Sequence, residues 1–364
     1  MGKIILMSDI HFGLKECNLN IEEADQREIN TKRKTKIDDF IEWLNIQQKD
    51  IEEFIFIGDI FDLHLSNFTK AISGSYYFLR KLDNLKGLKK ITYIPGNHDH
   101  TIWLLHIFYF DIIKKFESNN FPKFKGDFNF VYDRFFEEPN FPSFLRTIFT
   151  RKKDTKFCVT YPFKKENIAG KDYLFFHGHF LDKDQRVTQK LFKILLKDLD
   201  LSQLQQFELF CSPQYETFFL LAQCTEGRTG LKNRYEGVKK YLKKYRKPVH
   251  DLNRKIREHL REAGLRINNN PVFDELDYVI FGHTHYAGIG HYRFKKNPKL
   301  IGMNTGSWDH SDDRIGEFIV IDKNMSPNQH PQLYVYKWKQ PTPILHMHSE
   351  LLNDGEIPYK KIRD

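Results

Sequence analysis

Cysteine pairs are missing from this chain of 364 residues. Its four cysteines are Cys17, Cys158, Cys211 and Cys224. They are scattered without a CxxC spacing, so neither a disulfide framework nor a thiolate zinc knuckle is expected. We interpret them as free thiols in a reducing compartment, which predicts a cytoplasmic protein.

Long apolar runs are also missing. The first run, Ile4 to Met7, leads directly into polar residues and is too short for the apolar region of a signal peptide. The segment 102–116 is interrupted by His106 and Asp111 and is too short to span a bilayer. We therefore expect no membrane-spanning segment, with peripheral attachment to the inner face of a membrane as an alternative to a fully soluble protein.

Positive charge is in excess, because 57 Lys and Arg residues face 48 Asp and Glu residues, a formal net charge of +9. This excess suggests an anionic partner, although basic faces that only keep the protein soluble are an alternative. The basic segment 239–266 is the predicted contact for an anionic membrane surface, or else a solvated helix face. Nucleic-acid recognition motifs are absent, which makes nucleic acid a less favoured partner than a phosphorylated small molecule or lipid-linked substrate.

Five short apolar runs are typical of buried β-strands. They are 4–7, 54–57, 91–94, 173–176 and 278–281. Apolar residues at helical spacing in 37–44 and 76–82 indicate helices between the early strands, and this alternation predicts an α/β core. Further short strands between 286 and 338 predict a second sheet.

Two regions interrupt this alternation. Residues of about 101–156 are dense in Phe, Asn and Lys, and residues of about 184–270 look helical and become strongly basic. We interpret both as insertions that form a cap over a single domain of residues 1–339. Residues 340–364 are predicted to be a peripheral tail.

Each of the five predicted strands ends in a turn that carries Asp, Asn or His. Because ligands of open α/β sheets bind outside the carboxyl ends of the strands, we expect these turns to meet. The side chains concerned are Asp9, His11, Asp59, Asn97, His177, His283 and His285. Carboxylates, imidazoles and an amide suit Mn²⁺, Fe or Zn²⁺, and seven ligands are too many for one ion. The sequence therefore predicts two ions that share a bridging carboxylate.

Each of these motifs has a structural alternative when it stands alone. The stretch 58–62, GDIFD, could be an ordinary strand-to-turn junction, and 282–285, GHTH, a pair of surface histidines. The occurrence of all of them in a fixed order, each after an apolar strand, favours the metal site.

The order of the motifs resembles the calcineurin-like metallophosphoesterase superfamily. In this sequence they read Asp9-Ile10-His11, Gly58-Asp59-Ile60-Phe61-Asp62, Gly96-Asn97-His98-Asp99, His177 and Gly282-His283-Thr284-His285. The turn from Asn304 to Trp308 is similar to one that many members carry. The resemblance implies a four-layer α/β/β/α sandwich of two mixed sheets with helical cap insertions. In its details it is nearest to the UDP-2,3-diacylglucosamine pyrophosphatase-like branch.

By position, the resemblance implies two metal sites with a shared ligand. One ion is expected on Asp9, His11 and His285. The other is expected on Asn97, His177 and His283, and Asp59 is expected to bridge the two.

The resemblance also implies roles around the metals. His98 is expected to be the transition-state donor or general acid, oriented by Asp62 or Asp99 through a hydrogen bond. His177 is favoured over His179 as the ligand of its motif, because the first histidine is the ligand in the branch named above. His64, His100 and His106 are interpreted as packing or surface histidines.

The predicted function is a metal-dependent phosphoesterase, a hydrolase in which a metal-bridging hydroxide attacks a phosphoester or pyrophosphate bond. Two divalent ions are expected, with Mn²⁺ favoured over Fe or Zn²⁺. A nucleotide-lipid or small phosphodiester is the favoured substrate. The alternatives are a nuclease of the same superfamily and a non-catalytic interaction scaffold.

Overall fold

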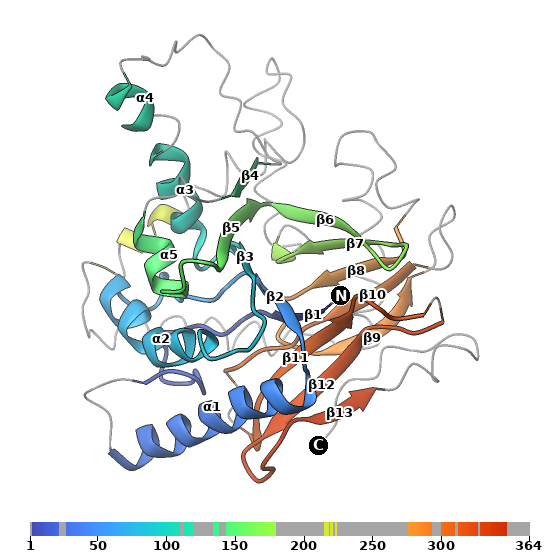
Figure 1. Cartoon of the computed structure of the whole chain (residues 1–364). Coiled ribbons are helices and arrows are strands. Elements are labelled where there is room, and N and C mark those ends of the chain that lie inside the picture. Colours follow the sequence, from blue (N-terminus) through green and yellow to red (C-terminus); the bar gives the residue numbers. More distant parts are fainter. Residues whose placement is uncertain are drawn as a thin grey trace, which may run out of the picture.

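Two β-sheets lie face to face in the computed structural model of the chain (Figure 1). The structure describes residues 2–21, 27–109, 113–118, 134–137, 143–179, 215–217, 219–220, 223, 276–292, 300–309, 312–326 and 328–347. Among these residues, no helix is both long and apolar enough to cross a bilayer.

The larger sheet has eight strands and a parallel centre. Its order is β13-β12-β11-β1-β2-β3-β5-β4. The parallel strands are β1 (Lys3–Met7), β2 (Ile51–Ile57), β3 (Lys90–Ile94) and β5 (Lys156–Tyr161). The antiparallel strands are β4 (Arg134–Glu137) at one edge and β11 (Arg314–Asp322), β12 (Gln332–Lys337) and β13 (Ile344–Met347) at the other.

The smaller sheet has five strands in the order β6-β7-β8-β10-β9. They are β6 (Phe163–Ile168), β7 (Lys171–Phe176), β8 (Tyr278–Phe281), β9 (Gly288–Tyr292) and β10 (Leu300–Asn304). The strands β7, β8 and β10 are parallel, whereas β6 and β9 are antiparallel to their neighbours. Both sheets are therefore mixed, which confirms the predicted α/β fold class.

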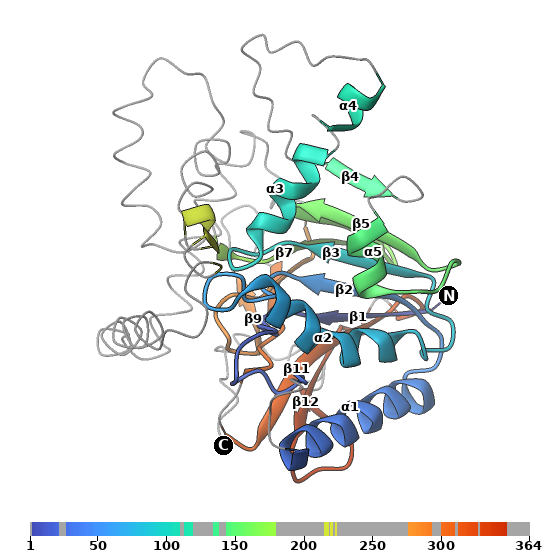
Figure 2. The ribbon, with the colours of Figure 1, turned by 90° about the vertical axis from the view of Figure 1, so that its left-hand side faces the viewer.

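Helices cover the outer face of the larger sheet. They are α1 (Arg27–Gln47), α2 (Phe68–Leu82) and α5 (Ser143–Phe149), and α3 (His100–Phe108) and α4 (Lys114–Glu117) continue toward one end (Figure 1). In Figure 2, α2 lies next to β1 and α1 lies near β12. The second helical layer that was predicted is not among the helices of the described residues.

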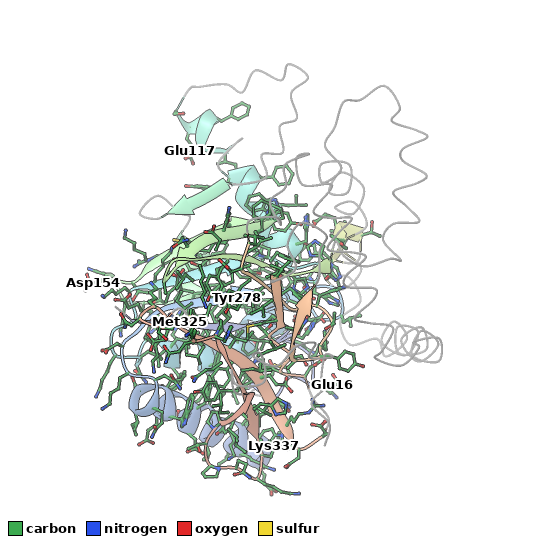
Figure 3. All side chains as sticks on the ribbon, turned by 90° about the vertical axis from the view of Figure 1, so that its right-hand side faces the viewer. Glu16, Glu117, Asp154, Tyr278, Met325 and Lys337 are labelled. Atoms are coloured by element: carbon green, nitrogen blue, oxygen red, sulfur yellow. The ribbon has the colours of Figure 1, made fainter. Side chains whose placement is uncertain are left out.

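The strand sequences explain why two cores form. Successive side chains of a strand point to opposite faces, so a fully apolar strand must be covered on both. In β1, Ile5 and Met7 pack against the helices, whereas Ile4 and Leu6 pack between the sheets. The inter-sheet core also contains Tyr278 and Met325, which Figure 3 labels among the densely packed side chains.

Some described elements within the ranges predicted as cap and tail belong to the larger sheet or its core. Strand β4 and helix α5 fall inside the predicted insertion 101–156, yet β4 extends the larger sheet and Phe149 of α5 is fully buried in the core. The Phe-rich composition of this region therefore partly reflects core packing. Strand β13 lies in the predicted tail but pairs with β12. Most of the second insertion, 184–270, lies outside the described residues.

Candidate metal centre

The predicted ligands gather at the carboxyl ends of five strands. Asp9 and His11 follow β1, Asp59 follows β2, Asn97 follows β3, His177 follows β7, and His283 and His285 follow β8. The strands β1, β2 and β3 belong to the larger sheet, and β7 and β8 to the smaller one. The site therefore lies where the ends of the two sheets meet, as the parallel strands require.

A first group of donors consists of Asp9, His11 and His285, each of which offers one ligand atom within 4.8 Å of the others. The Nε2 atom of His285 lies 3.3 Å from Oδ1 of Asp9 and 3.2 Å from Nε2 of His11. Asp9 is completely buried and also accepts hydrogen bonds from the backbone N–H of His283. This is the set expected for the first ion.

A second group consists of Asp59, His177 and His283 within the same 4.8 Å limit. The Nε2 atom of His177 lies 3.1 Å from Oδ2 of Asp59 and 3.2 Å from Oδ1 of Asn97. Asp59 also belongs to a third group with His11 and His98, so it stands between the first two groups. The structure thus brings all seven predicted ligands together, and both groups draw residues from both sheets.

The three imidazoles that point Nε2 into the centre are each oriented through Nδ1. His11 donates to Asp62 at 3.0 Å, and His285 donates to Asp309 at 3.1 Å. His177 donates to the backbone carbonyl of Ile57 at 3.0 Å. Metal-binding histidines generally have such an acceptor behind them, because it fixes the tautomer and the direction of the ring.

This arrangement fits a pair of cations. With Nδ1–H given to a carboxylate, neutral His11 and His285 each leave a bare Nε2, and two bare nitrogens 3.2 Å apart repel unless positive charge lies between them. Burial lowers the pKa of His11, but the hydrogen bond to Asp62 and the charges of Asp59, Asp62 and Asp309 raise it overall to about 10. The site therefore attracts positive charge, and its oxygen and nitrogen donors without sulfur suit hard or borderline divalent ions.

The backbone at the site adopts a sparsely populated conformation. Seven non-glycine residues of the described chain have positive φ, and five are predicted ligands: Asp9, His11, Asp59, His283 and His285. Such left-handed residues are costly and persist at sites where the surrounding structure holds them. Position 96 requires glycine for a steric reason, because a Cβ atom there would collide with Asp59 and His177.

His98 stands beside the centre and is partly open to solvent, with 14% of its side chain exposed. Its Nδ1 lies 3.0 Å from Oδ2 of Asp62, the same oxygen that accepts from His11. Burial lowers the pKa of His98, but the charges of Asp62 and Asp59 raise it overall. One carboxylate therefore orients both a predicted ligand and the predicted donor.

The structure favours Asp62 over Asp99 as the residue that orients His98, because Nδ1 of His98 lies 3.0 Å from Oδ2 of Asp62. The two oxygens of Asp99 accept hydrogen bonds from the backbone N–H groups of Gly96 at 2.6 Å and Ile60 at 2.8 Å. Asp99 therefore connects the turns after β2 and β3.

His179 is also fully buried, but its Nε2 lies 3.3 Å from the hydroxyl of Tyr161. It belongs to none of the three donor groups found in the described residues. This placement supports His177 as the ligand of the fourth motif and makes His179 part of the wall beside it.

Asp309 and Tyr215 are residues at the site that the sequence interpretation missed. Asp309 follows the turn from Asn304 to Trp308, so its position next to a family-like motif was a usable signal. Tyr215 lies in an insertion and gave no signal.

A family model described as calcineurin-like phosphoesterase matches residues 2–287. The chain belongs to the calcineurin-like phosphoesterase family. The matched stretch includes all seven predicted ligands and His98. No curated protein matches the chain.

Solved structures that are similar to this phosphoesterase family member share 10% sequence identity with it. One is a conserved uncharacterized protein, a predicted phosphoesterase, from Streptococcus pneumoniae (TM-score 0.29, covering 93% of this chain and 90% of that chain). Another is Vps29 complexed with Zn²⁺ from Entamoeba histolytica (TM-score 0.30, covering 99% and 98%). A third is GAP50 of Plasmodium (TM-score 0.33, covering 93% and 85%).

Proposed function

We propose that the protein is a metal-dependent phosphoesterase that hydrolyses a phosphoester or pyrophosphate bond with two divalent ions bound at its strand ends. The observation that carries the proposal is the two donor groups, Asp9–His11–His285 and Asp59–His177–His283, with Asp59 also close to His11 of the first group, in a chain of the phosphoesterase family. The acceptors behind the imidazoles support the same conclusion, because surface histidines need no such orientation.

The residues divide the work of such a reaction. Asp9, His11 and His285 would hold one ion, Asn97, His177 and His283 the other, and Asp59 both. When bound, two such ions polarise the phosphoryl oxygens and make the attacking water more acidic. His98, with its raised pKa and its partly exposed ring, is placed to donate a hydrogen bond to the leaving oxygen.

The finer assignments are also proposals. We propose Mn²⁺ as the resident metal, because imidazole and carboxylate ligands without thiolate suit it. We propose a nucleotide-lipid or small phosphodiester as substrate, in keeping with the resemblance of GDIFD, HGH and the turn after β10. The net charge of +9 favours a nuclease as the second candidate. Contact with an anionic membrane through 239–266 stays a prediction on residues outside the described ones.

The test combines metal analysis with a substrate panel. Protein purified without chelator is analysed for bound metals and then assayed with Mn²⁺, Fe²⁺ or Zn²⁺ against an aryl phosphomonoester, a bis-aryl phosphodiester, a nucleoside-diphosphate lipid, DNA and RNA. We expect about two ions per chain and turnover of at least one ester. Turnover of only the polynucleotides would favour the nuclease, whereas bound metal with no turnover, or no bound metal, would favour the scaffold.

A further inference from the structure

A column of three rings leads from the metal centre into the second predicted insertion. His98 and His64 have ring centroids 4.8 Å apart, with 32° between their planes. His64 in turn stacks on Tyr215, with centroids 5.6 Å apart and 29° between the planes. His98 follows β3, His64 follows β2 and Tyr215 lies in the helical segment 215–217, so the column joins three distant parts of the chain.

Tyr215 is firmly seated on the core. Only 4% of it is exposed, and its ring also contacts that of His100, the first residue of α3, at a centroid distance of 5.2 Å. The next residue, Glu216, accepts a hydrogen bond of 2.7 Å from the hydroxyl of Thr101 in α3. Further along, Gln223 accepts one of 2.8 Å from the backbone N–H of Phe68 in α2. Figure 2 shows this segment, in yellow, beside α3.

The contacts of His98 explain why such a column matters. The ion pair with Asp62 fixes the position of Nδ1, but a single contact of this kind leaves the ring able to tilt about it. The edge-on contact with His11, at 4.9 Å and 88°, limits the tilt on one side. The ring of His64 limits it on another, and Tyr215 supports His64 from behind. A misplacement of a catalytic group by about 1 Å can cost about 100-fold in rate.

We propose that Tyr215 is a positioning residue that acts through His64 to fix the plane of His98 against the leaving oxygen of the substrate. This inference rests on the proposed function. It assigns a role to the second insertion, which supplies the outer ring of the column. The competing explanation is that Tyr215 only attaches the insertion to the core.

The leaving group separates these two roles. An ester with a poor leaving group, such as phenyl phosphate, depends on donation to its leaving oxygen, whereas a nitrophenyl ester depends on it less. For Tyr215→Ala we expect kcat to fall about 10- to 100-fold on the phenyl ester and less than about threefold on the nitrophenyl ester, with metal content unchanged. Tyr215→Phe keeps the ring and should restore the wild-type ratio of the two rates.

His64→Ala should cause the same selective loss of kcat on the phenyl ester. Because Tyr215 acts through His64, the double variant should be no slower than the slower single variant. Phe219→Ala is the matched control, since Phe219 belongs to the same insertion and packs against the core outside the column. This control should not change the ratio of the two rates. Thermal unfolding and metal analysis of each variant identify any that fail to fold.

A readout without turnover tests the positioning of His98 separately from the proposed activity. In the Zn²⁺-loaded protein, the imidazole ¹H–¹⁵N signals of His98, assigned by their loss in His98→Ala, should shift or broaden in Tyr215→Ala and His64→Ala but not in Phe219→Ala. Unchanged signals in folded Tyr215→Ala, or equal loss of rate on both esters, would overturn the inference. A wild-type protein that hydrolyses neither ester and no other member of the substrate panel would instead overturn the proposed function.

Discussion

Two buried clusters of charge in this protein differ in the partners of their carboxylates. At the metal centre, Asp9 and Asp59 face imidazoles. Elsewhere, Glu53 of β2 lies 2.9 Å from Nζ of Lys164 in the other sheet and 3.4 Å from Nζ of Lys90, and it accepts a hydrogen bond of 2.6 Å from Thr92. Both clusters link the two sheets, but only in the first can the partners of the carboxylates lose their protons and bind a metal ion instead.

The difference follows from the chemistry of the partners. An imidazole can lose its proton near neutral pH and then offer a lone pair to a metal ion, whereas a paired ammonium keeps its proton. Burial raises the pKa of Glu53, but the charges of Lys164 and Lys90 and the bond from Thr92 bring it below its ordinary value. The same pairing raises the pKa of Lys164 despite burial. Glu53 therefore serves the fold, whereas the role that we propose for Asp59 is metal binding.

Asp59→Asn should have the largest effect and should affect function rather than folding. We expect activity to fall to background, because the variant loses the carboxylate that we propose to hold both ions. In the wild type, Mn²⁺ at about 100 times its Kd should raise the unfolding free energy by about 2.7 kcal/mol, and this gain should be absent or much reduced in the variant. Thermal unfolding with and without Mn²⁺ measures it. Asp39→Asn, at a partly exposed position on α1, is the control. An Asp59→Asn variant that keeps the full gain would contradict the assignment of Asp59.

His98→Ala should slow turnover about 10²- to 10⁴-fold while both ions stay bound, because it removes a donor and no ligand. The measurements are kcat on a slow phosphoester and metal content by mass spectrometry. His346→Ala, at an exposed position in β13, is the control for replacing a histidine outside the site. Wild-type turnover by His98→Ala would remove His98 from the reaction.

Glu53→Gln should lower the stability of the protein and leave its activity nearly unchanged, the opposite of the two substitutions at the metal centre. Loss of one member of a buried ion pair costs about 3–5 kcal/mol of stability, while kcat per folded molecule should stay near wild type. Because the folded-state pKa of Glu53 is lowered, its contribution is present above the ordinary carboxyl pKa and is lost as pH falls through the folded-state value.

Urea unfolding of wild type and Glu53→Gln between neutral and acidic pH measures this difference, which should shrink as pH falls. A double variant, Glu53→Met with Lys164→Met, leaves no unpaired charge from that pair and should recover much of the loss. A difference that is constant with pH would mean that the charge of Glu53 contributes little.

Lys90→Met should have the smallest effect. Its side chain is 23% exposed, so its ion pair with Glu53 is screened by solvent, and we expect a loss of about 0–1 kcal/mol in urea unfolding. A loss as large as that of Glu53→Gln would mean that Lys90, rather than Lys164, is the main partner of Glu53.

The sequence was sufficient to predict the five strands that precede the ligand motifs and the seven residues that gather at their ends. Each strand is a continuous apolar run, and each ligand follows such a run within a few residues, so local pattern carried the information. It was also sufficient to place His98 beside the ligands, because Asn97 and His98 are neighbours in one turn.

Features that depend on distant packing could not be predicted in this way. Whether Asp62 or Asp99 faces His98 depends on how the turns after β2 and β3 meet. The stacking of Tyr215 on His64 joins two residues that are distant in the sequence, and no local pattern predicts it. The pairing of Glu53 with Lys164 requires knowledge of which face of each strand points inward.

The assembly of each donor group from both sheets has a mechanical consequence. His11 and His285 are 274 residues apart in sequence, so their nitrogens come close only when the two sheets pack against each other. A cation bound between them would hold the two sheets together at one end of the sandwich. Separating the sheets would first require breaking its coordination bonds. Removal of the metal by a chelator should therefore weaken the association of the two sheets, in addition to abolishing activity.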